Sequence, residues 1–260
     1  GMSRLGYKDK EELIKSIKLL RENKNIFIEG IYTHLATSGI NDKYYDKQID
    51  KFMYLTEDID LKEIPIVHLN RSITLTHHKM LPFETGTRLG IIMYGFSQSL
   101  SEPVGLRKIK RDILNKIRHI SPTVMSNDLK LKTAFSLYSE VMSIRCIKKG
   151  DFVGYGANYI AKEDTIIGTI PIGYADGMSS LMKYVCINKK KYPILGDICM
   201  DMTIVKLDDR VKLHDKVEIF GDTISVKSVA NNMHSNAYHV LTGVTSRVPR
   251  IYSDGKTIKY

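Results

Sequence analysis

The first 95 residues alternate between helical and extended hydrophobic patterns, which limits the possible folds more than any other feature. Apolar residues recur at helical spacing after Asp9, which together with Glu12 resembles a capping box. Helices are expected over residues 9–20, 42–56 and 72–78, and strands over residues 26–33, 64–69 and the stretch leading into Arg88. The second helix should bury a face that carries Tyr45, Ile49, Phe52 and Met53. Alternation at this spacing predicts a parallel sheet with crossover helices.

Several polar residues fall near the expected carboxyl ends of these strands. In parallel sheets functional groups gather at those ends, so His34, Ser72, Arg88 and Gly90 are predicted to share one site. Arg88 is expected to end a buried strand that opens to a cleft. Gly90 leaves its backbone N–H free to approach an anion such as a phosphate. The alternative is an ordinary strand end with a surface salt bridge.

The pattern changes from about Lys132 onward, where short β-rich stretches alternate with turn signals such as Lys149-Gly150-Asp151. Strands are expected at residues 141–144, 165–170, 194, 198, 203–205 and 217–220. These short strands predict an all-β domain, most simply a small barrel. We therefore expect an α/β domain over residues 1–130 and a β-domain over residues 131–260.

A basic segment precedes the predicted β-domain. Residues 107–118 place basic side chains around an isoleucine stripe, as in an amphipathic helix. Both a solvated face on a packed helix and a basic binding module fit this pattern. The net charge of +10 could attract a polyanion, but a lysine-rich surface accounts for it equally well. We expect no nucleic-acid partner.

Composition argues against several other classes of protein. No apolar stretch approaches the roughly 20 residues of a membrane helix, and the first residues lack signal-peptide character. Cys146, Cys186 and Cys199 are unevenly spaced and form no C-x-x-C pair. Neither a disulfide framework nor a zinc site is expected, and a reducing cytoplasm fits best. We expect no membrane partner and no metal.

Seven short motifs occur along the chain in a fixed order. They are Gly1-Met2-Ser3-Arg4-Leu5-Gly6, Tyr32-Thr33-His34, Arg88-Leu89-Gly90-Ile91, Gly154-Tyr155-Gly156-Ala157, Ile172-Gly173-Tyr174-Ala175-Asp176-Gly177, Ile198-Cys199-Met200-Asp201 and Arg247-Val248-Pro249-Arg250. Together they resemble bacterial alanine racemases, the fold-type III pyridoxal-phosphate enzymes, from the first residue to the last.

The resemblance implies a (β/α)8 barrel that binds pyridoxal 5′-phosphate, a C-terminal β-domain, and a homodimer with composite active sites. It implies an isomerase that interconverts L- and D-alanine and supplies D-alanine for peptidoglycan. The family places its Schiff-base lysine upstream of the Gly-Met-Ser-Arg-Leu-Gly motif, so this lysine and about half of the barrel are expected to be absent from the chain. The chain alone is expected to be inactive and to need the missing half for stability. A late-starting reading frame and a fragment both remain open.

The resemblance also assigns catalytic roles. Arg88 matches the arginine that faces the pyridine nitrogen of the cofactor, where a permanently protonated guanidinium keeps that nitrogen unprotonated. Tyr155 matches the catalytic base on the second face of the substrate, donated by the partner subunit. Racemisation needs one base on each face of Cα. His34 matches the histidine that bridges the tyrosine and the arginine, although it could be an ordinary core histidine.

Further residues match the binding positions of the family. Arg4 matches the arginine near the cofactor's phenolic oxygen and the substrate carboxylate. The phosphate cradle is matched by Ser72, Gly90 and Ile91. Tyr174 and Met200 match positions that the partner contributes to the substrate entrance, although core packing explains both equally well.

Two positions depart from the family pattern. Arg71 stands where an asparagine is usual and adds positive charge near the phosphate. Ser246 stands where many members carry a tyrosine, which would enlarge the substrate pocket. Serine racemisation is therefore an alternative activity. A non-catalytic remnant that binds the cofactor or dimerises is another.

Overall fold

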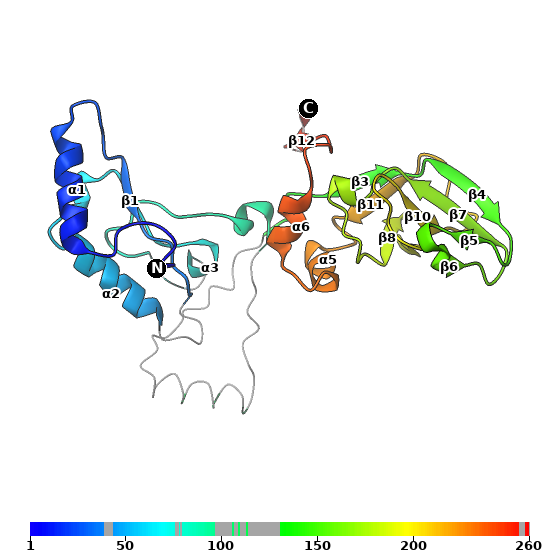
Figure 1. Cartoon of the computed structure of the whole chain (residues 1–260), viewed down its shortest axis with the longest axis horizontal. Helices are drawn as coiled ribbons and strands as arrows, with labels where there is room; N and C mark the ends of the chain where they lie inside the picture. The colour runs from blue at the N-terminus through cyan, green and yellow to red at the C-terminus, as the bar shows by residue number, and fades with distance from the viewer. Residues whose placement is uncertain are drawn as a thin grey trace. The chain divides into compact units, whose positions relative to one another are not determined.

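The computed structural model describes residues 1–38, 44–75, 78, 80–96, 106, 109, 113, 131–254 and 258–259. The chain divides into two compact units, Gly1–Lys132 and Thr133–Tyr260 (Figure 1). The boundary expected near residue 130 and most of the basic helix expected over residues 107–118 lie outside the described residues.

The first unit contains the expected alternation of helices and strands. Its elements are α1 (Lys10–Glu22), β1 (Gly30–Tyr32), α2 (Tyr44–Thr56), η1 (Leu61–Glu63), β2 (Ile66–His68), α3 (Ser72–Leu75) and η2 (Ile91–Tyr94). Strands β1 and β2 pair in parallel, which confirms the predicted sheet type. Asp9 begins α1, since its side chain accepts the backbone N–H of Glu12 at 2.9 Å.

The core of the first unit lies between the two long helices and the sheet. Leu13 of α1 and Phe52 of α2 belong to one buried cluster with Val67 and Leu69 from β2 and its end. Met53 is 41% exposed, so its placement on the buried face of α2 is wrong. The buried residues of α2 are Tyr45, Phe52 and Thr56, which lie seven and four positions apart on one face of the helix. Met53 lies just beside that face.

The strand predicted to lead into Arg88 is also wrong. Residues 84–88 run beside β2 through a few backbone bonds, but Arg88 forms only an isolated parallel bridge with Arg71. The chain then turns at Gly90, and Ile91–Tyr94 closes the 3₁₀ turn η2. The strand predicted over residues 26–33 is shorter than expected as well. Phe27 is 75% exposed, because the sheet contacts with β2 begin only at Glu29 and Gly30.

The second unit is built mainly of antiparallel strands. They are β3 (Leu137–Glu140), β4 (Ser143–Ile147), β5 (Phe152–Val153), β6 (Tyr159–Ile160), β7 (Thr165–Ile170), β8 (Tyr184–Ile187), β9 (Lys190–Pro193), β10 (Thr203–Lys206), β11 (Lys216–Phe220), β12 (Tyr252–Ser253) and β13 (Ile258–Lys259). One sheet has the order β3-β11-β8-β9 and another β10-β7-β4. An isolated bridge between Ile194 and Val205 joins them. The strands expected at residues 165–170, 203–205 and 217–220 are confirmed, whereas Ile198 lies outside any strand.

Two helices contradict the expectation that this unit is all-β. They are α5 (Val226–Asn232) and α6 (Ala237–Gly243). Ser225 caps α5 by accepting the N–H of Ser228, and Asn236 caps α6 by accepting the N–H of His239. Val226, Val229 and Val240 are buried, so packing stabilises helices whose valines have modest helix propensity.

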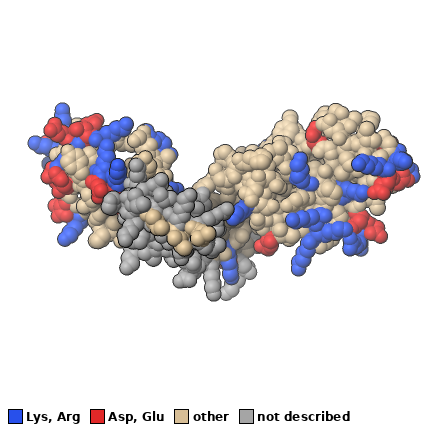
Figure 2. Space-filling model, turned by 90° about the horizontal axis from the view of Figure 1, so that it is seen from below, with Lys and Arg blue, Asp and Glu red and all other residues tan. Residues whose placement is uncertain are grey.

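The surface carries both signs of charge. Figure 2 shows basic and acidic side chains interspersed on the face in view, and pairs such as Lys148–Asp164 and Lys206–Glu163 lie 2.8 Å apart. Among the helices of the described residues, none has the length and hydropathy required to span a membrane. Cys146, Cys186 and Cys199 are all free thiols.

Candidate active site

Arg88 lies against groups from the carboxyl ends of both parallel strands. Its Nε donates to Nδ1 of His34 at 3.1 Å, and its Nη1 lies 3.5 Å from Nδ1 of His68. The guanidinium also lies 4.2 Å from the ring centroid of Tyr32, in cation–π contact. Tyr32 and His68 are paired residues in the β1–β2 register, so the parallel sheet brings these rings together. An arginine fixed in this way keeps further N–H donors for a ligand.

The surroundings of His34 favour its neutral form. Burial lowers its pKa below the usual 6.5, and the positive charges of Arg88, Arg71 and Arg4 lower the pKa further. Because Nδ1 accepts the hydrogen bond from Arg88, the remaining proton is assigned to Nε2. The imidazole therefore offers an N–H donor on the side that faces away from Arg88.

Ser72, Gly90 and Ile91 meet next to this arginine. The N–H of Gly90 donates to Oγ of Ser72 at 2.9 Å, while Ser72 and Ile91 are 7% and 4% exposed. Since the serine oxygen accepts this bond, its own O–H can still donate. The backbone bridge between Arg71 and Arg88 holds these segments side by side.

A buried carboxylate that the sequence analysis missed supports this arrangement. Glu84 is 8% exposed and accepts the backbone N–H groups of Leu69 and Asn70 at 2.8 Å and of Leu81 at 2.9 Å. It also accepts Nδ2 of Asn70 at 2.5 Å. The N–H of Arg88 in turn donates to the carbonyl of Asn70 at 2.7 Å. Glu84 thus fixes the end of β2 and the segment that delivers Arg88.

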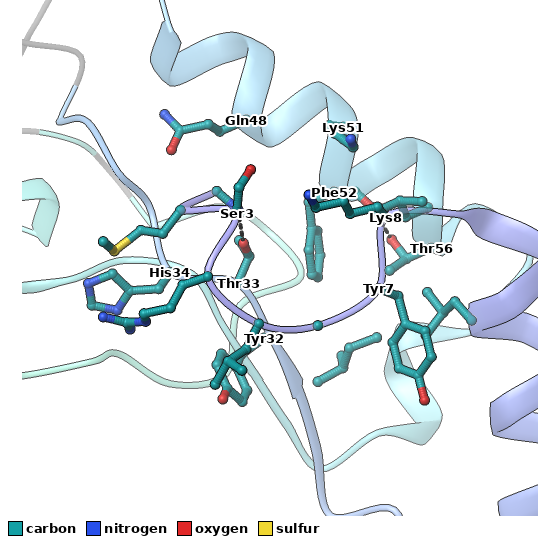
Figure 3. Close-up of a pocket in the computed structure, with 18 of the residues that line it drawn as sticks. Ser3, Tyr7, Lys8, Tyr32, Thr33, His34, Gln48, Lys51, Phe52 and Thr56 are labelled. Carbon is teal, nitrogen blue, oxygen red and sulfur yellow. Dashed lines mark hydrogen bonds between the residues drawn. The ribbon is translucent and has the colours of Figure 1, made fainter.

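A hollow of about 640 Å³ opens beside this cluster. Figure 3 shows His34 and Tyr32 at one side of it, with Gln48 and Phe52 from α2 across from them. Arg4 also lines it, on the exposed segment before α1. Arg88, Ser72 and Gly90 do not line it, and much of its wall is apolar side chains of α1 and α2. The hollow therefore only borders the cluster around Arg88.

The remaining predicted residues belong to the second unit. Tyr155 lies in η3 (Tyr155–Ala157) between Gly154 at φ 77° and Gly156 at φ 67°, conformations that favour glycine. Its side chain is 75% exposed. Asn158 donates to Asp197 at 2.6 Å and so connects this turn to the loop before Met200.

The turns that carry Tyr174 and Met200 are bonded to each other. The N–H of Tyr174, in η4 (Tyr174–Asp176), donates to the carbonyl of Cys199, and the N–H of Ala175 donates to that of Met200. The side chains of Tyr174 and Met200 are 51% and 52% exposed. In this chain they are not core residues.

Arg247 links the same two turns through their acids. It donates to Asp201 at 2.6 Å and lies 3.7 Å from Asp176. Ser246 is exposed. It lies between Arg247 and Thr245, whose hydroxyl donates to the carbonyl of Ala175 in the Tyr174 turn. Tyr155, Tyr174 and Met200 are therefore exposed side chains on segments that hydrogen bonds connect. Within the described residues, no group of three or more metal-binding side chains occurs.

Two family models and several solved structures match this chain. The family model "Alanine racemase, N-terminal domain" matches residues 1–98, and "Alanine racemase, C-terminal domain" matches residues 134–252. The chain belongs to the alanine racemase family. The alanine racemases of Anoxybacillus flavithermus and Geobacillus stearothermophilus are each 33% identical to it over an alignment of 265 positions, which covers 99% of this chain and 63% and 62% of the two relatives.

Solved alanine racemases share its fold. The Clostridium difficile structure gives a TM-score of 0.81 at 29% identity and covers all of this chain and 64% of its own. The Bacillus anthracis structure, solved with bound L-Ala-P, gives 0.78 at 30% identity, with 99% of this chain and 64% of its own covered. The fold of these racemases is a TIM barrel with a β-domain. The chain spans about 63% of the length of such relatives.

Proposed function

We propose that this chain supplies one part of a pyridoxal-phosphate-dependent alanine racemase. The observation that carries the proposal is the bond that Arg88 donates to Nδ1 of His34, made at the ends of two parallel strands in a chain of this family. The proposal includes a homodimer in which the second unit of one subunit completes the site of the other.

The residues present fit the cofactor. A phosphate needs several N–H or O–H donors, and the Ser72 hydroxyl and the Arg71 guanidinium bring such groups together beside Gly90, although the Gly90 N–H, expected to be free, donates to Ser72 in this structure. The Nε atom of Arg71 is buried without a hydrogen-bond partner among the described residues, as expected where a ligand supplies the acceptor. When bound, pyridoxal phosphate would supply the electron-withdrawing ring that acidifies Cα–H of the attached amino acid.

Arg88 and His34 would act as a pair. The guanidinium stays protonated and donates to His34, so it cannot hand a proton to a ring nitrogen placed against it. His34 accepts the bond that keeps Arg88 in this orientation, and its Nε2–H would donate to the partner's phenol. Arg4, at the edge of the same cluster, would bind the substrate carboxylate.

Tyr155 would hold and move the proton on the second face of Cα. Its exposed side chain on a turn fixed by glycines supports a role at a surface that meets another subunit. Tyr174 and Met200 would line the entrance beside it. The exposure of all three favours a composite site over a role in the core of their own unit.

The lysine that binds the cofactor covalently is proposed to lie in the part of the family's length that this chain does not span. The chain should then bind the cofactor without a covalent bond and racemise nothing by itself. Borohydride reduction followed by peptide mass spectrometry tests this, since a lysine adduct within residues 1–260 would contradict it.

Completion of the enzyme tests the function. The chain is co-expressed with the N-terminal part of the Geobacillus stearothermophilus alanine racemase that it does not span, and L-alanine racemisation is followed. Tyr155→Phe and Arg88→Lys should abolish or strongly reduce the activity, whereas Tyr138→Phe, a substitution on strand β3, should retain it. A folded, cofactor-loaded complex without activity would favour the non-catalytic alternative.

L-Serine is the second candidate substrate. Ser246 is small, exposed and next to the residues bonded to the Tyr174 turn, which leaves space for a hydroxymethyl group. The completed enzyme should racemise L-serine at a rate comparable to L-alanine, and Ser246→Tyr should restore a preference for alanine. A strong alanine preference in the parent would contradict the serine alternative.

A further inference from the structure

Guanidinium groups gather around His34 without acidic partners. Arg88 contacts His34 directly, and the charges of Arg71 and Arg4 are close enough to lower its pKa. Among the described residues, no carboxylate forms an ion pair with any of these three arginines. Other arginines do have such partners, namely Arg21 with Glu63, Arg210 with Asp208 and Arg247 with Asp201. Clustered cations repel one another, so this arrangement indicates an anion that is part of the functional state.

Arg71 is the least satisfied member of this cluster. Its Nε is buried with no hydrogen-bond partner in the described chain, and its Nη2 makes one long contact of 3.3 Å with the carbonyl of Ala36. A buried N–H without an acceptor destabilises the fold. An anionic oxygen would satisfy it.

The backbone places Arg71 beside the proposed phosphate donors. Arg71 directly precedes Ser72, whose hydroxyl accepts the N–H of Gly90, and it bridges to Arg88. Its backbone N–H donates to Oγ1 of Thr74 at 2.7 Å, and that hydroxyl donates back to the Arg71 carbonyl at 2.9 Å. These bonds fix the backbone position from which the Arg71 side chain extends.

We propose that Arg71 binds the phosphate of the ligand directly, as an additional cation in an anion site shared with Ser72 and Gly90. The identity of the ligand rests on the proposed function, whereas the anion site rests on the arrangement of the arginines. Arg71 would then make phosphate recognition strong enough to retain a phosphorylated pyridoxal without a covalent bond. Pyridoxal without its phosphate would gain nothing from Arg71.

The test compares three ligands on the full chain. Inorganic phosphate, pyridoxal phosphate and pyridoxal are titrated at constant ionic strength, by calorimetry for the first and absorbance for the other two. Arg71→Gln should weaken phosphate and pyridoxal phosphate about tenfold, as expected for the loss of one charge-assisted hydrogen-bond donor, and should leave pyridoxal unchanged. Arg71→Lys should recover part of the affinity, because the charge remains while the forked geometry is lost.

Arg145→Gln, an exposed substitution on β4, is the matched control and should change nothing. Thermal unfolding in phosphate-free buffer shows whether Arg71→Gln remains folded. If that variant is unfolded, the phosphate titrations of Arg71→Lys test the inference instead. Equal phosphate affinity in the parent and both Arg71 variants, or no phosphate binding by the parent, would overturn the inference. The proposed function fails separately, if the completed enzyme is loaded with cofactor and yet inactive.

Discussion

Arg247 and Asp201 form a 2.6 Å hydrogen-bonded ion pair, which connects two segments that lie 46 residues apart in the sequence. The same guanidinium lies 3.7 Å from Asp176, at the end of the turn that carries Tyr174. Because Met200 directly precedes Asp201, one arginine holds both exposed side chains in a common arrangement.

Breaking this pair should loosen Tyr174 without unfolding the second unit. The chain contains no tryptophan, so Tyr174→Trp introduces a single fluorescent reporter. Adding Arg247→Met should lower the fluorescence anisotropy of that reporter and increase its quenching by iodide. Arg145→Met in the same background should leave both signals unchanged. Unchanged anisotropy in the Arg247 variant would mean that the backbone bonds to Cys199 and Met200 are sufficient.

A methyl group should be far less tolerated at Gly177 than at Gly150. Both glycines have positive φ, +99° and +96°, so alanine at either should cost about 1–2 kcal/mol in backbone strain. A Cβ at Gly177 would also lie 2.1 Å from the carbonyl oxygen of Gly243, whereas nothing lies within 4 Å of one at Gly150. Urea unfolding should therefore show a clearly larger loss for Gly177→Ala. Equal losses would contradict the close approach of α6 to this turn.

Neutralising Glu84 should release the end of β2. A glutamine has only one acceptor oxygen, so its amide would face the Leu81 N–H and Asn70 Nδ2 donors without accepting them. We expect Glu84→Gln to destabilise the first unit by about 2–4 kcal/mol. Hydrogen exchange of the Leu69, Asn70 and Leu81 amides should accelerate together. The exposed Glu63→Gln should change stability by less than about 1 kcal/mol, although it loses an ion pair with Arg21.

The two histidines beside Arg88 should make the first unit less stable in mild acid. Burial and the Arg88 charge lower the pKa of His34 and of His68 below 6.5, while Glu84 partly opposes the shift at His68. Well above pH 6.5 both are neutral in the folded and the unfolded chain, so they add no pH dependence there. Below it, the unfolded chain binds protons that the folded chain does not, so the free energy of unfolding falls with pH.

Urea titrations between pH 5 and 7.5 measure this effect. The double variant His34→Gln, His68→Gln should show a flatter pH profile than the parent, and the exposed control His214→Asn should follow the parent. Identical profiles for the parent and the double variant would show that neither histidine resists protonation in the folded state.

Local patterns were sufficient to predict much of the fold. The Asp9 cap, the helical stripe of α1 and the β-branched runs of β7 and β10 each act over a few residues, and each forms as expected. The predicted strand into Arg88 failed because contacts between residues far apart in the sequence decide that geometry. Glu84 binds the backbone of residues 69 and 70, and no short-range pattern reports such a contact. The helices α5 and α6 were missed although Ser225 and Asn236 are recognisable caps, because the neighbouring valines favour strands.

The candidate site shows the same difference between features that local patterns predict and features that depend on long-range contacts. Their place near the expected carboxyl ends of parallel strands identified Arg88, His34, Ser72 and Gly90, and the structure brings these four together within the first unit. Tyr32 and His68 were missed, since their role depends on the β1–β2 register. A signal was available: both residues come at the end of an apolar strand, where His34 was singled out. Asp197 was missed because only the folded loop brings it to Asn158.

The connected turns of the second unit have a consequence for how this protein could vary. Tyr155, Tyr174 and Met200 depend on shared supports such as Asp197, Asp201 and Arg247, so a substitution at one support would disturb more than one of them. The exposed side chains of Tyr155, Tyr174 and Met200 contribute little to the bonds that hold these turns together. Under the proposed function, substitutions at these three side chains would change the preferred amino acid, whereas the residues that support them would change only through paired replacements.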